Sequence, residues 1–365
     1  MSIKNSKNLL MMKIMEYDFN NDLKYIKERI GIDDFFFKDK HFLITGGTGF
    51  FGKWIILYLL YLNKYFFLNI KITVITRSKK NFLDQSNLFR CNDLYFIESD
   101  IRNVKLNSSF DYLIHMATTN AQETFLGEDQ INKVDLLYQG TKNILENAIK
   151  CKVKRILFTS SGTVYGPIKC KDDSIESFGK SVDTSTFNSG LAQGKRIAEY
   201  LVNYYSKKNS IPFSIARCFS FIGPFLPSDI HYAAGNFIRD AIIRDDIVIS
   251  GDGSPVRSYL DVRDLVIWLL KLLNFDENLV VNVGSSEDIS IYSLACKIRD
   301  IISPKKNIIL EGSRNEINNL AINYYVPNID LITSKLNVKQ TINLDQSIIN
   351  YAKFFKASRD FNSNI

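Results

Sequence analysis

One stretch, HFLITGGTGFFGK at residues 41–53, constrains the fold of this chain more than any other. Residues 42–44 form a short apolar run typical of a buried parallel strand. Gly46, Gly49 and Gly52 follow at three-residue spacing, which lets the backbone approach a pyrophosphate at the N-terminus of the next helix. A glycine triplet can also mark only a tight turn with close helix–strand packing. In this context, the stretch predicts a dinucleotide site.

The neighbouring residues supply that context. Residues 54–62 are apolar and predict a buried helix, and residues 70–76 predict a second strand. Phe50 and Phe51, at the start of the helix, are candidate cofactor contacts. A strand, a glycine turn, a helix and a second strand together favour a dinucleotide-binding unit over a simple turn.

The end of the second strand bears on which dinucleotide binds. An acidic residue there accepts a hydrogen bond from the ribose 2′-hydroxyl of NAD, whereas an arginine accommodates the 2′-phosphate of NADP. This chain has Thr76, Arg77 and Ser78 at that point, with no acidic residue. Arg77 therefore favours NADP and leaves NAD open, although it can also be a solvated residue at a strand end.

Strands and helices continue to alternate after this unit. The predicted elements are strands at 93–99, 111–117 and 155–159 and a long helix at 129–149. Asp100 and Ile101 follow the third strand and are expected at the adenine, while the small side chain of Ala117 leaves room for the cofactor. This alternation predicts an α/β fold with a doubly wound parallel sheet, a Rossmann fold.

With 365 residues, the chain has room for a large cofactor domain and a smaller partner. We expect an N-terminal extension at 1–38, a dinucleotide-binding domain mainly at 39–215, and a substrate-binding lobe mainly at 216–365, some of whose segments return to the sheet. Leu23, Ile26 and Ile30 have helical spacing and predict a short helix in the extension.

Composition excludes several classes of protein. The net charge of +7 comes from scattered lysines without a basic block, so nucleic acid is not an expected partner; the excess suits an anionic ligand or simply a solvated surface. Five cysteines without a C-x-x-C pair and three histidines predict neither a disulfide framework nor a metal site. The apolar run at 9–12 is too short for a signal or a membrane span. We therefore expect a cytoplasmic protein that needs no membrane.

Several motifs occur together in one order. They are TGGTGFFG at 45–52, TSSGTVYG at 159–166, GKRIAE at 194–199, ARCFSFIGP at 216–224, GDGSPVRSY at 251–259 and NVGS at 282–285. In this combination the chain resembles the extended short-chain dehydrogenase/reductase superfamily, and within it the NAD-dependent epimerase/dehydratase family that acts on nucleotide sugars. The resemblance covers nearly everything after residue 40 and implies a cytoplasmic enzyme that contributes to polysaccharide biosynthesis.

The resemblance also implies a catalytic set. Ser161 matches the hydroxyl that hydrogen-bonds the reacting sugar oxygen, with Thr163 beside it. Lys195 matches the lysine that binds the nicotinamide ribose and lowers the pKa of a neighbouring phenol. That phenol stands four residues before the lysine, one helical turn away. In this chain the position is Leu191.

Leucine cannot exchange a proton, and no tyrosine lies between Tyr165 and Tyr200 to restore the motif. Three interpretations remain open. A water, Ser161 or, less in keeping with the family pattern, Tyr165 takes the proton; the chemistry differs from the usual oxidation; or the protein binds ligands without turning them over.

A second departure narrows the reaction. Relatives that act as 4,6-dehydratases carry an Asp-Glu pair directly after the catalytic hydroxyl, where this chain has Gly162 and Thr163. Relatives that decarboxylate a uronic acid place a glutamate near the same site, and it is also missing here. The signature is therefore more similar to that of the 4-epimerases.

For the substrate, Arg257 matches an arginine that contacts the diphosphate, the alternative being an ion pair with Asp261 or Asp264. Asn236 matches an asparagine of the diphosphate region, and Ser220 stands where many relatives have an asparagine that faces the sugar.

His231 lies nearby but is interpreted as incidental. The resemblance further suggests a homodimer formed by helices at 129–149 and 190–206.

Together these features predict an NDP-hexose 4-epimerase or an NDP-4-keto-sugar reductase that uses NAD(P). An atypical 4,6-dehydratase and a catalytically silent protein that binds nucleotide sugar or dinucleotide remain as alternatives.

Overall fold

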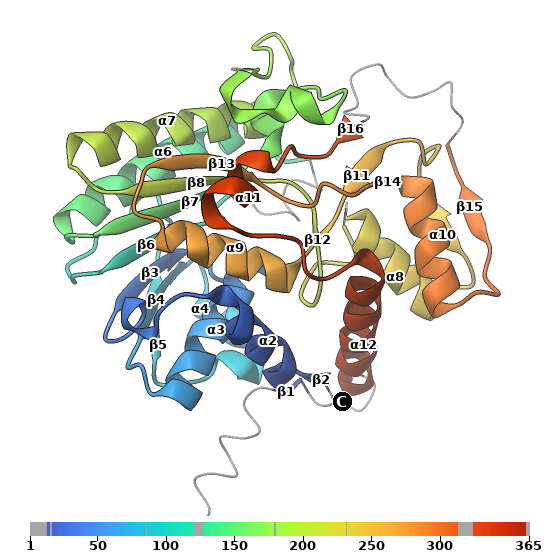
Figure 1. The fold of residues 1–365 in the computed structure, drawn as a ribbon, viewed down its shortest axis with the longest axis horizontal. Helices are drawn as coiled ribbons and strands as arrows, with labels where there is room; N and C mark the ends of the chain where they lie inside the picture. The colour runs from blue at the N-terminus through green and yellow to red at the C-terminus, as the bar shows by residue number, and fades with distance from the viewer. Residues whose placement is uncertain are drawn as a thin grey trace, which may run out of the picture.

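A computed structural model describes residues 13–14, 17–84, 86–119, 127–178, 180–230, 232–312 and 324–362. Its centre is a seven-stranded sheet in the order β13-β8-β7-β6-β3-β4-β5 (Figure 1). Every neighbouring pair in this sheet is parallel. The strands are β3 (His41–Thr45), β4 (Lys71–Thr76), β5 (Leu94–Glu98), β6 (Tyr112–His115), β7 (Arg155–Ser161), β8 (Phe213–Cys218) and β13 (Leu279–Val283).

The strand order reverses beside β3. The chain runs outward from β3 through β4 to β5, and then returns to place β6 on the other side of β3. Such a switch point opens a crevice at the carboxyl ends of the strands, where ligands bind in doubly wound sheets. The predicted fold class is confirmed.

Helices cover both faces of the sheet. Figure 1 shows α6 (Gln130–Lys150) and α7 (Gly190–Lys208) together on one face and α3 (Phe50–Phe66) and α9 (Val262–Asn274) on the other. Alternation along β3 explains how both faces become apolar, since Phe42 and Ile44 pack in the core with α3 and α9 while Leu43 packs in the core under α6 and α7. The helix expected at 54–62 extends at both ends.

The remaining elements form a smaller lobe beside the carboxyl ends of the strands, and α9 and β13 return from it to the sheet (Figure 1). Its short strands form β9·β12, β10·β15 and β14·β11·β16 sheets. Their bounds are β9 (Phe221–Ile222), β10 (Ile247–Ile249), β11 (Val256–Ser258), β12 (Leu260–Asp261), β14 (Asp288–Ser290), β15 (Ile308–Leu310) and β16 (Tyr324–Tyr325). The helices of this part are α8 (Ala233–Ile243), α10 (Ile291–Ile302) and α12 (Leu344–Asn362), while α11 (Asp330–Leu336) packs against β13.

Smaller elements of the described chain include the hairpin strands β1 (Lys13–Ile14) and β2 (Tyr17–Asp18) and helix α4 (Lys79–Asp84). Within the described ranges, no helix is both long and apolar enough to cross a bilayer. The apolar run at 9–12 lies outside those ranges.

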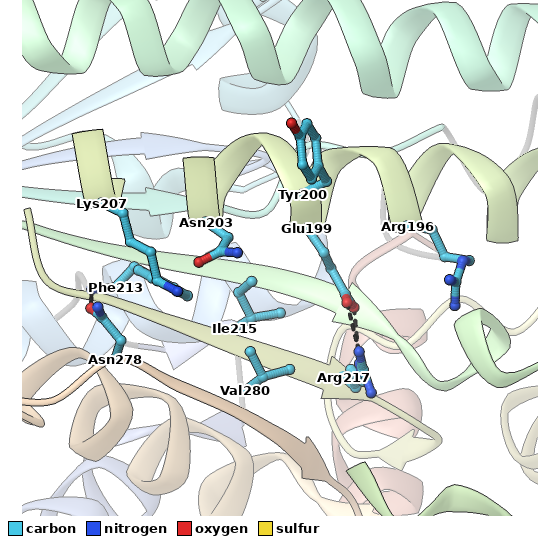
Figure 2. A pocket seen from close by; sticks show the side chains of 10 residues that line it. All are labelled: Arg196, Glu199, Tyr200, Asn203, Lys207, Phe213, Ile215, Arg217, Asn278 and Val280. Atoms are coloured by element: carbon cyan, nitrogen blue, oxygen red, sulfur yellow. Dashed lines mark hydrogen bonds and ion pairs between the residues drawn. The ribbon is translucent and has the colours of Figure 1, made fainter. Parts of the chain in front are cut away.

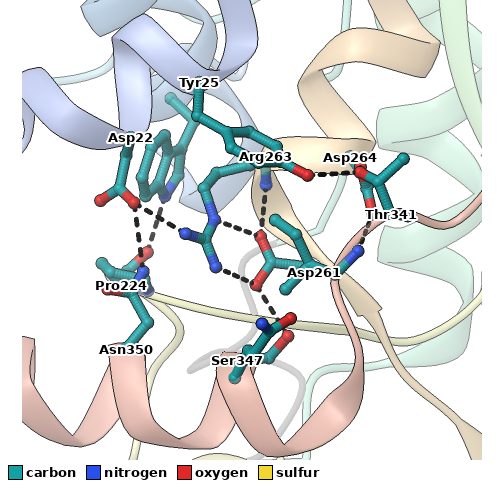
Figure 3. A network of polar contacts seen from close by, with 12 residues as sticks. Asp22, Tyr25, Pro224, Asp261, Arg263, Asp264, Thr341, Ser347 and Asn350 are labelled. Carbon is teal, nitrogen blue, oxygen red and sulfur yellow. Dashed lines mark hydrogen bonds and ion pairs between the residues drawn. The ribbon is translucent and has the colours of Figure 1, made fainter. Parts of the chain in front are cut away.

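The helix predicted in the N-terminal extension is confirmed as α2 (Asn20–Ile30), whose residues Leu23, Ile26 and Ile30 are buried against α3 and α9. A buried polar network fixes this helix to the rest of the protein (Figure 3). Arg263 of α9 donates to Asp22 over 2.9 Å and, in a fork, to Asp261 over 2.8 Å at each oxygen.

The network continues into the C-terminal helix. Ser347 of α12 donates to Asp261 over 2.7 Å, and the Tyr17 hydroxyl donates to Asp22 over 2.5 Å. Segments from near both ends of the described chain therefore meet on α9, and residues 17–30 are packed as part of the fold.

Candidate functional site

The glycine turn after β3 has the shape of a phosphate cradle. Gly46 has φ +69°, and a Cβ on it would lie 2.6 Å from the backbone carbonyl carbon of Met116. A Cβ on Gly52 would lie 2.4 Å from the Gly47 Cα. Both positions need glycine because the turn packs tightly on β6 and on the first turn of α3.

Gly49 differs from these two glycines. It caps α3 without a side-chain hydrogen bond, and a Cβ there would meet only the Gly46 carbonyl oxygen, at 3.4 Å. The first turn of a helix leaves backbone N–H groups without partners inside the helix, and here they belong to Phe50, Phe51 and Gly52. The cradle therefore fits the diphosphate of a dinucleotide.

A buried histidine links the strands on either side of the switch point. The Ala117 N–H donates to Thr45 Oγ1 over 3.1 Å, and this hydroxyl lies 2.6 Å from His115 Nδ1. His115 Nε2 in turn lies 3.0 Å from Thr141 Oγ1 on α6. Burial lowers the pKa of His115 to about 3, so the imidazole is neutral and aligns the ends of β3 and β6. Sequence reasoning had missed this role, although a histidine inside an apolar strand signals a buried hydrogen-bonded group.

At the other end of the crevice, Arg77 follows β4 and is exposed. Asp100 is held by Arg102, whose Nε and Nη2 donate to it over 3.0 and 2.7 Å, and this contact together with the charge of Arg77 lowers the pKa of Asp100. Ile101 packs against Gly140 of α6, where a Cβ would come within 2.5 Å of its side chain. The expected adenine contacts of Asp100 and Ile101 therefore remain predictions.

The candidate reaction centre lies at the carboxyl end of β7. Thr163 donates to Ser161 Oγ twice, from its N–H over 3.2 Å and from its hydroxyl over 3.0 Å. These two predicted residues are therefore in direct contact. A third hydroxyl, that of Tyr325 on β16, lies 3.3 Å from Ser161 Oγ.

Lys195 of α7 reaches the same end of β7 from behind. Only 4% of the residue is exposed, and its Nζ donates to the Thr159 carbonyl over 2.7 Å. Burial lowers the pKa of Lys195 to about 8, against the opposing influence of Cys218 and Glu199. Leu191 lies one turn earlier on the helix and is half-buried. Lys195 thus lies at the end of β7, its role at the nicotinamide ribose stays a prediction, and Leu191 offers no hydroxyl one turn before it.

Tyr165 does not fill that gap. It is 1% exposed, its hydroxyl donates to Asn282 over 2.8 Å, and it accepts from Arg217 over 3.0 Å. Arg217 also forms a fork with Glu199 at 2.8 and 3.1 Å, and Ser160 donates to the same carboxylate over 2.5 Å. This network braces β7, β8, β13 and α7, and it directs Tyr165 and Ser160 into structural contacts.

A hollow of about 440 Å³ lies between α7 and the β8–β13 edge of the sheet (Figure 2). Figure 2 shows the ion pair of Glu199 and Arg217 at its wall, with Tyr200 and Arg196 on the same helix. No predicted site residue lines this hollow. Two of its lining residues, Glu199 and Arg217, belong to the network that binds Ser160 and Tyr165.

Arg257 stands on β11 in the smaller lobe. Its expected alternative, an ion pair with Asp261 or Asp264, is wrong, because Asp261 is bound by Arg263 and Asp264 accepts from the backbone after α11. Within the ranges that the structure describes, Arg257 has no carboxylate at ion-pair distance. Burial lowers its pKa, and its Nη1 donates to the Val256 carbonyl over 2.8 Å. A half-buried guanidinium in this state is suited to an anionic ligand.

Asn236 lies in the first turns of α8, where its Nδ2 donates to the Ile230 carbonyl over 2.5 Å. Its Oδ1 is buried and has no hydrogen-bond partner among the described residues, which suits a ligand donor. Ser220 is half-buried between β8 and β9, and its carbonyl accepts from the Leu260 N–H over 3.1 Å. His231 lies outside the described residues.

Comparisons with known proteins agree with the fold and the motifs described above. The family model described as "NAD dependent epimerase/dehydratase family" matches residues 42–284. UDP-glucuronic acid decarboxylase 6 from Arabidopsis thaliana is 28% identical over 274 residues, which cover 75% of this chain and 78% of that protein.

Two solved structures share the fold. UDP-N-acetylglucosamine 4-epimerase from Methanobrevibacter ruminantium M1, in complex with UDP-N-acetylmuramic acid, matches with a TM-score of 0.74 at 19% identity over 88% of this chain and 99% of that chain. UDP-glucuronic acid 4-epimerase from Bacillus cereus, in complex with UDP-glucuronic acid and NAD, matches with a TM-score of 0.72 at 21% identity over 87% of this chain and 99% of that chain.

Proposed function

Because this chain belongs to the NAD-dependent epimerase/dehydratase family, we propose that it modifies a nucleotide-diphosphate sugar by NAD(P)-dependent hydride transfer at a sugar carbon. Relatives that epimerise or decarboxylate UDP-sugars support a nucleotide-sugar-modifying enzyme. Within this class we propose a hexose 4-epimerase or a reductase of a 4-keto sugar.

One arrangement carries the proposal. The hydroxyl pair of Ser161 and Thr163 lies at the carboxyl end of β7, and the buried ammonium of Lys195 binds the carbonyl of Thr159 in the same strand. Two strands away along the sheet, the glycine turn after β3 presents the N-terminus of α3 to the same crevice. A cofactor diphosphate at the turn and a sugar hydroxyl at Ser161 would bring the reacting carbon and the nicotinamide together.

The choice of reaction rests on what stands beside Ser161. A Cβ at Gly162 would lie 2.6 Å from the ring of Phe219, so the ring occupies the space that an acidic side chain would need. Elimination and decarboxylation in relatives depend on acidic residues at this point, whereas epimerisation and reduction need only hydride transfer and a proton at the oxygen. Gly162 and Phe219 therefore favour a 4-epimerase or a reductase.

The proposed cofactor is NAD(P), which supplies or accepts the hydride when bound. Gly46, Gly49 and Gly52 would hold its diphosphate, and Lys195 would bind the nicotinamide ribose. The B. cereus neighbour binds NAD, while the exposed cation of Arg77 after β4 favours the 2′-phosphate of NADP. Arg77 thus supports the second candidate, an NADPH-dependent reductase.

We further propose a homodimer that forms through α6 and α7. These helices pack on one another and expose large apolar side chains, with Ile131 66%, Tyr200 62%, Tyr204 46% and Tyr138 38% accessible.

A reducing cytoplasmic compartment suits the five cysteines, all of which are free.

The test begins with gentle purification, denaturation and mass spectrometry of any released dinucleotide. NAD that stays bound would favour the epimerase, because its cofactor is regenerated within one turnover; an empty site that binds NADPH would favour the reductase. The protein is then incubated with UDP-, dTDP- and GDP-hexoses and their 4-keto forms, and the sugar products are followed by proton NMR, with Ser161→Ala as the control.

Two results would redirect the proposal. Release of a 4-keto-6-deoxy sugar without added reductant would identify an atypical dehydratase. Binding of both ligands without any product across this panel would identify a catalytically silent protein.

A further inference from the structure

We infer that the phenol of Tyr325, a residue of the smaller lobe, replaces the missing tyrosine one turn before Lys195 and exchanges the proton of the reacting sugar oxygen. This inference rests on the proposed function and adds a catalytic residue to it. No sequence motif identifies Tyr325, because it lies 164 residues beyond Ser161 in the chain.

Contacts at the end of β7 carry the inference. The Tyr325 hydroxyl is 3.3 Å from Ser161 Oγ, and it donates to the Cys218 carbonyl over 3.4 Å. Both distances are long for hydrogen bonds between oxygens, so a sugar hydroxyl or carbonyl could replace them at little cost. Thr163 donates to Ser161, which leaves the Ser161 proton free to point toward the same oxygen as the phenol.

The local packing holds the phenol in this position. β16 pairs in parallel with β11, where Tyr325 stands opposite Arg257. The Tyr325 ring packs on the Phe219 ring with centroids 4.6 Å apart, and Phe219 occupies the space that Gly162 leaves. The chain thus lacks a hydroxyl at Leu191 and a side chain at Gly162, and in the same place it brings the Tyr325 hydroxyl next to Ser161.

The surrounding charges are compatible with proton donation. Burial raises the pKa of Tyr325 to about 12, against the opposing influences of Ser161 and Arg257, so the phenol carries its proton near neutral pH. Lys195 lies behind the same strand end, and the Cys218 thiol interacts electrostatically with both Lys195 and Tyr325.

In the reducing direction the step balances with NAD(P)H as the reductant. A hydride adds to the carbonyl carbon, the phenol O–H bond breaks as its proton bonds to the carbonyl oxygen, and the phenolate takes a proton from solvent. The ketone becomes an alcohol and the dinucleotide is oxidised to NAD(P)⁺. The oxidising half of an epimerisation is the reverse of this step.

The first test is Tyr325→Phe, which removes the hydroxyl and keeps the ring against Phe219. We expect kcat to fall about 100- to 10,000-fold, the usual contribution of general acid–base catalysis, with KM and the Kd of the nucleotide sugar changed by less than about threefold. Tyr324→Phe, the neighbouring residue of β16, is the matched control and should keep wild-type kcat. An unchanged kcat in Tyr325→Phe, or a loss confined to KM, overturns the inference.

A second readout does not depend on turnover. With ¹³C-labelled tyrosine, the Cζ resonance of Tyr325 is assigned as the one lost in Tyr325→Phe. Saturation with a nucleotide sugar should move this resonance and leave that of Tyr324 in place. A bound nucleotide sugar with no movement of the Tyr325 resonance overturns the inference alone, whereas calorimetry that detects no binding of any nucleotide sugar overturns the proposed function and the inference with it.

Discussion

The buried network around Arg263 allows a quantitative test of how the N-terminal helix α2 is held. The Arg263 side chain is 13% exposed and binds Asp22, 7% exposed, and Asp261, 1% exposed. Arg263→Met would keep most of the side-chain volume and remove the only cation in direct contact with these two carboxylates within the described network (Figure 3). Two buried negative charges would then lack compensation.

Breaking a buried ion pair from one side costs about 3 to 5 kcal/mol, because the remaining charge stays desolvated. With an m value of about 3 kcal/mol/M in urea, the unfolding midpoint should fall by about 1 to 1.7 M. Circular dichroism and tryptophan fluorescence can both follow the transition. Trp54 lies on α3, and its fluorescence should change when unfolding breaks the hydrogen bond of 2.8 Å from its indole N–H to the Pro224 carbonyl.

A double-mutant cycle separates the ion pair from other effects. The double variant with both Arg263→Met and Asp22→Asn should lose less unfolding free energy than the two single variants lose together. The difference, the coupling energy, should be about 1 to 3 kcal/mol. Lys24→Met is the control on the same helix; its partner Glu28 is exposed, so the midpoint should hardly move. A loss below about 1 kcal/mol in Arg263→Met, or full additivity, would refute this account of how α2 is held.

Four further predictions concern Lys195, Arg77 and Gly162. Turnover should fall as the pH rises above about 8, because burial lowers the pKa of Lys195 to about 8 and the side chain loses its charge there. A pH–rate profile of wild type and of Lys195→Met checks this. The variant should lose about 100- to 10,000-fold of kcat and should no longer show the fall in rate above pH 8. Between that pH and the ordinary lysine pKa of 10.5, the unfolded chain holds a proton that the native chain has released, so urea titrations should show wild type gaining stability with pH relative to Lys195→Met. Arg77→Ala should reduce the preference for NADPH over NADH, measured as the ratio of their Kd values, about 10- to 100-fold, because one charge-assisted hydrogen bond is lost. An unchanged ratio would show that Arg77 does not contact the 2′-phosphate. Gly162→Ala should displace the Phe219 ring and lower the free energy of unfolding in urea by about 1 to 3 kcal/mol. It should also lower kcat while the dinucleotide binds normally. A normal kcat would mean that the ring tolerates the methyl group.

Local patterns in the sequence were enough for the fold class and for the glycine turn after β3. The strands predicted at 42–44, 70–76, 93–99, 111–117 and 155–159 correspond to β3 to β7, and the glycines at three-residue spacing form the turn at the N-terminus of α3. Hydrophobic periodicity also predicted α2 before the structure placed it. These features depend on residues close together in the chain, so their physical cause, steric freedom and the period of burial, is readable from the sequence.

Motifs predicted Ser161, Thr163 and Lys195, and the structure brings them to the end of one strand. The same motifs predicted an absence at Leu191 but could not say what stands in its place. They also left open whether Arg257 pairs with Asp261 or Asp264. This alternative fails because Asp261 binds Arg263 and Ser347, and Asp264 accepts from Thr341.

Only the tertiary structure decided the contacts between distant segments. Tyr325 meets Ser161 because β16 pairs with β11 and its ring packs on Phe219. Asp22 meets Arg263 across 241 residues in the same way. Such contacts depend on how the smaller lobe and the N-terminal helix pack against the sheet, and that packing is set by the shapes of whole surfaces rather than by any local spacing of residues.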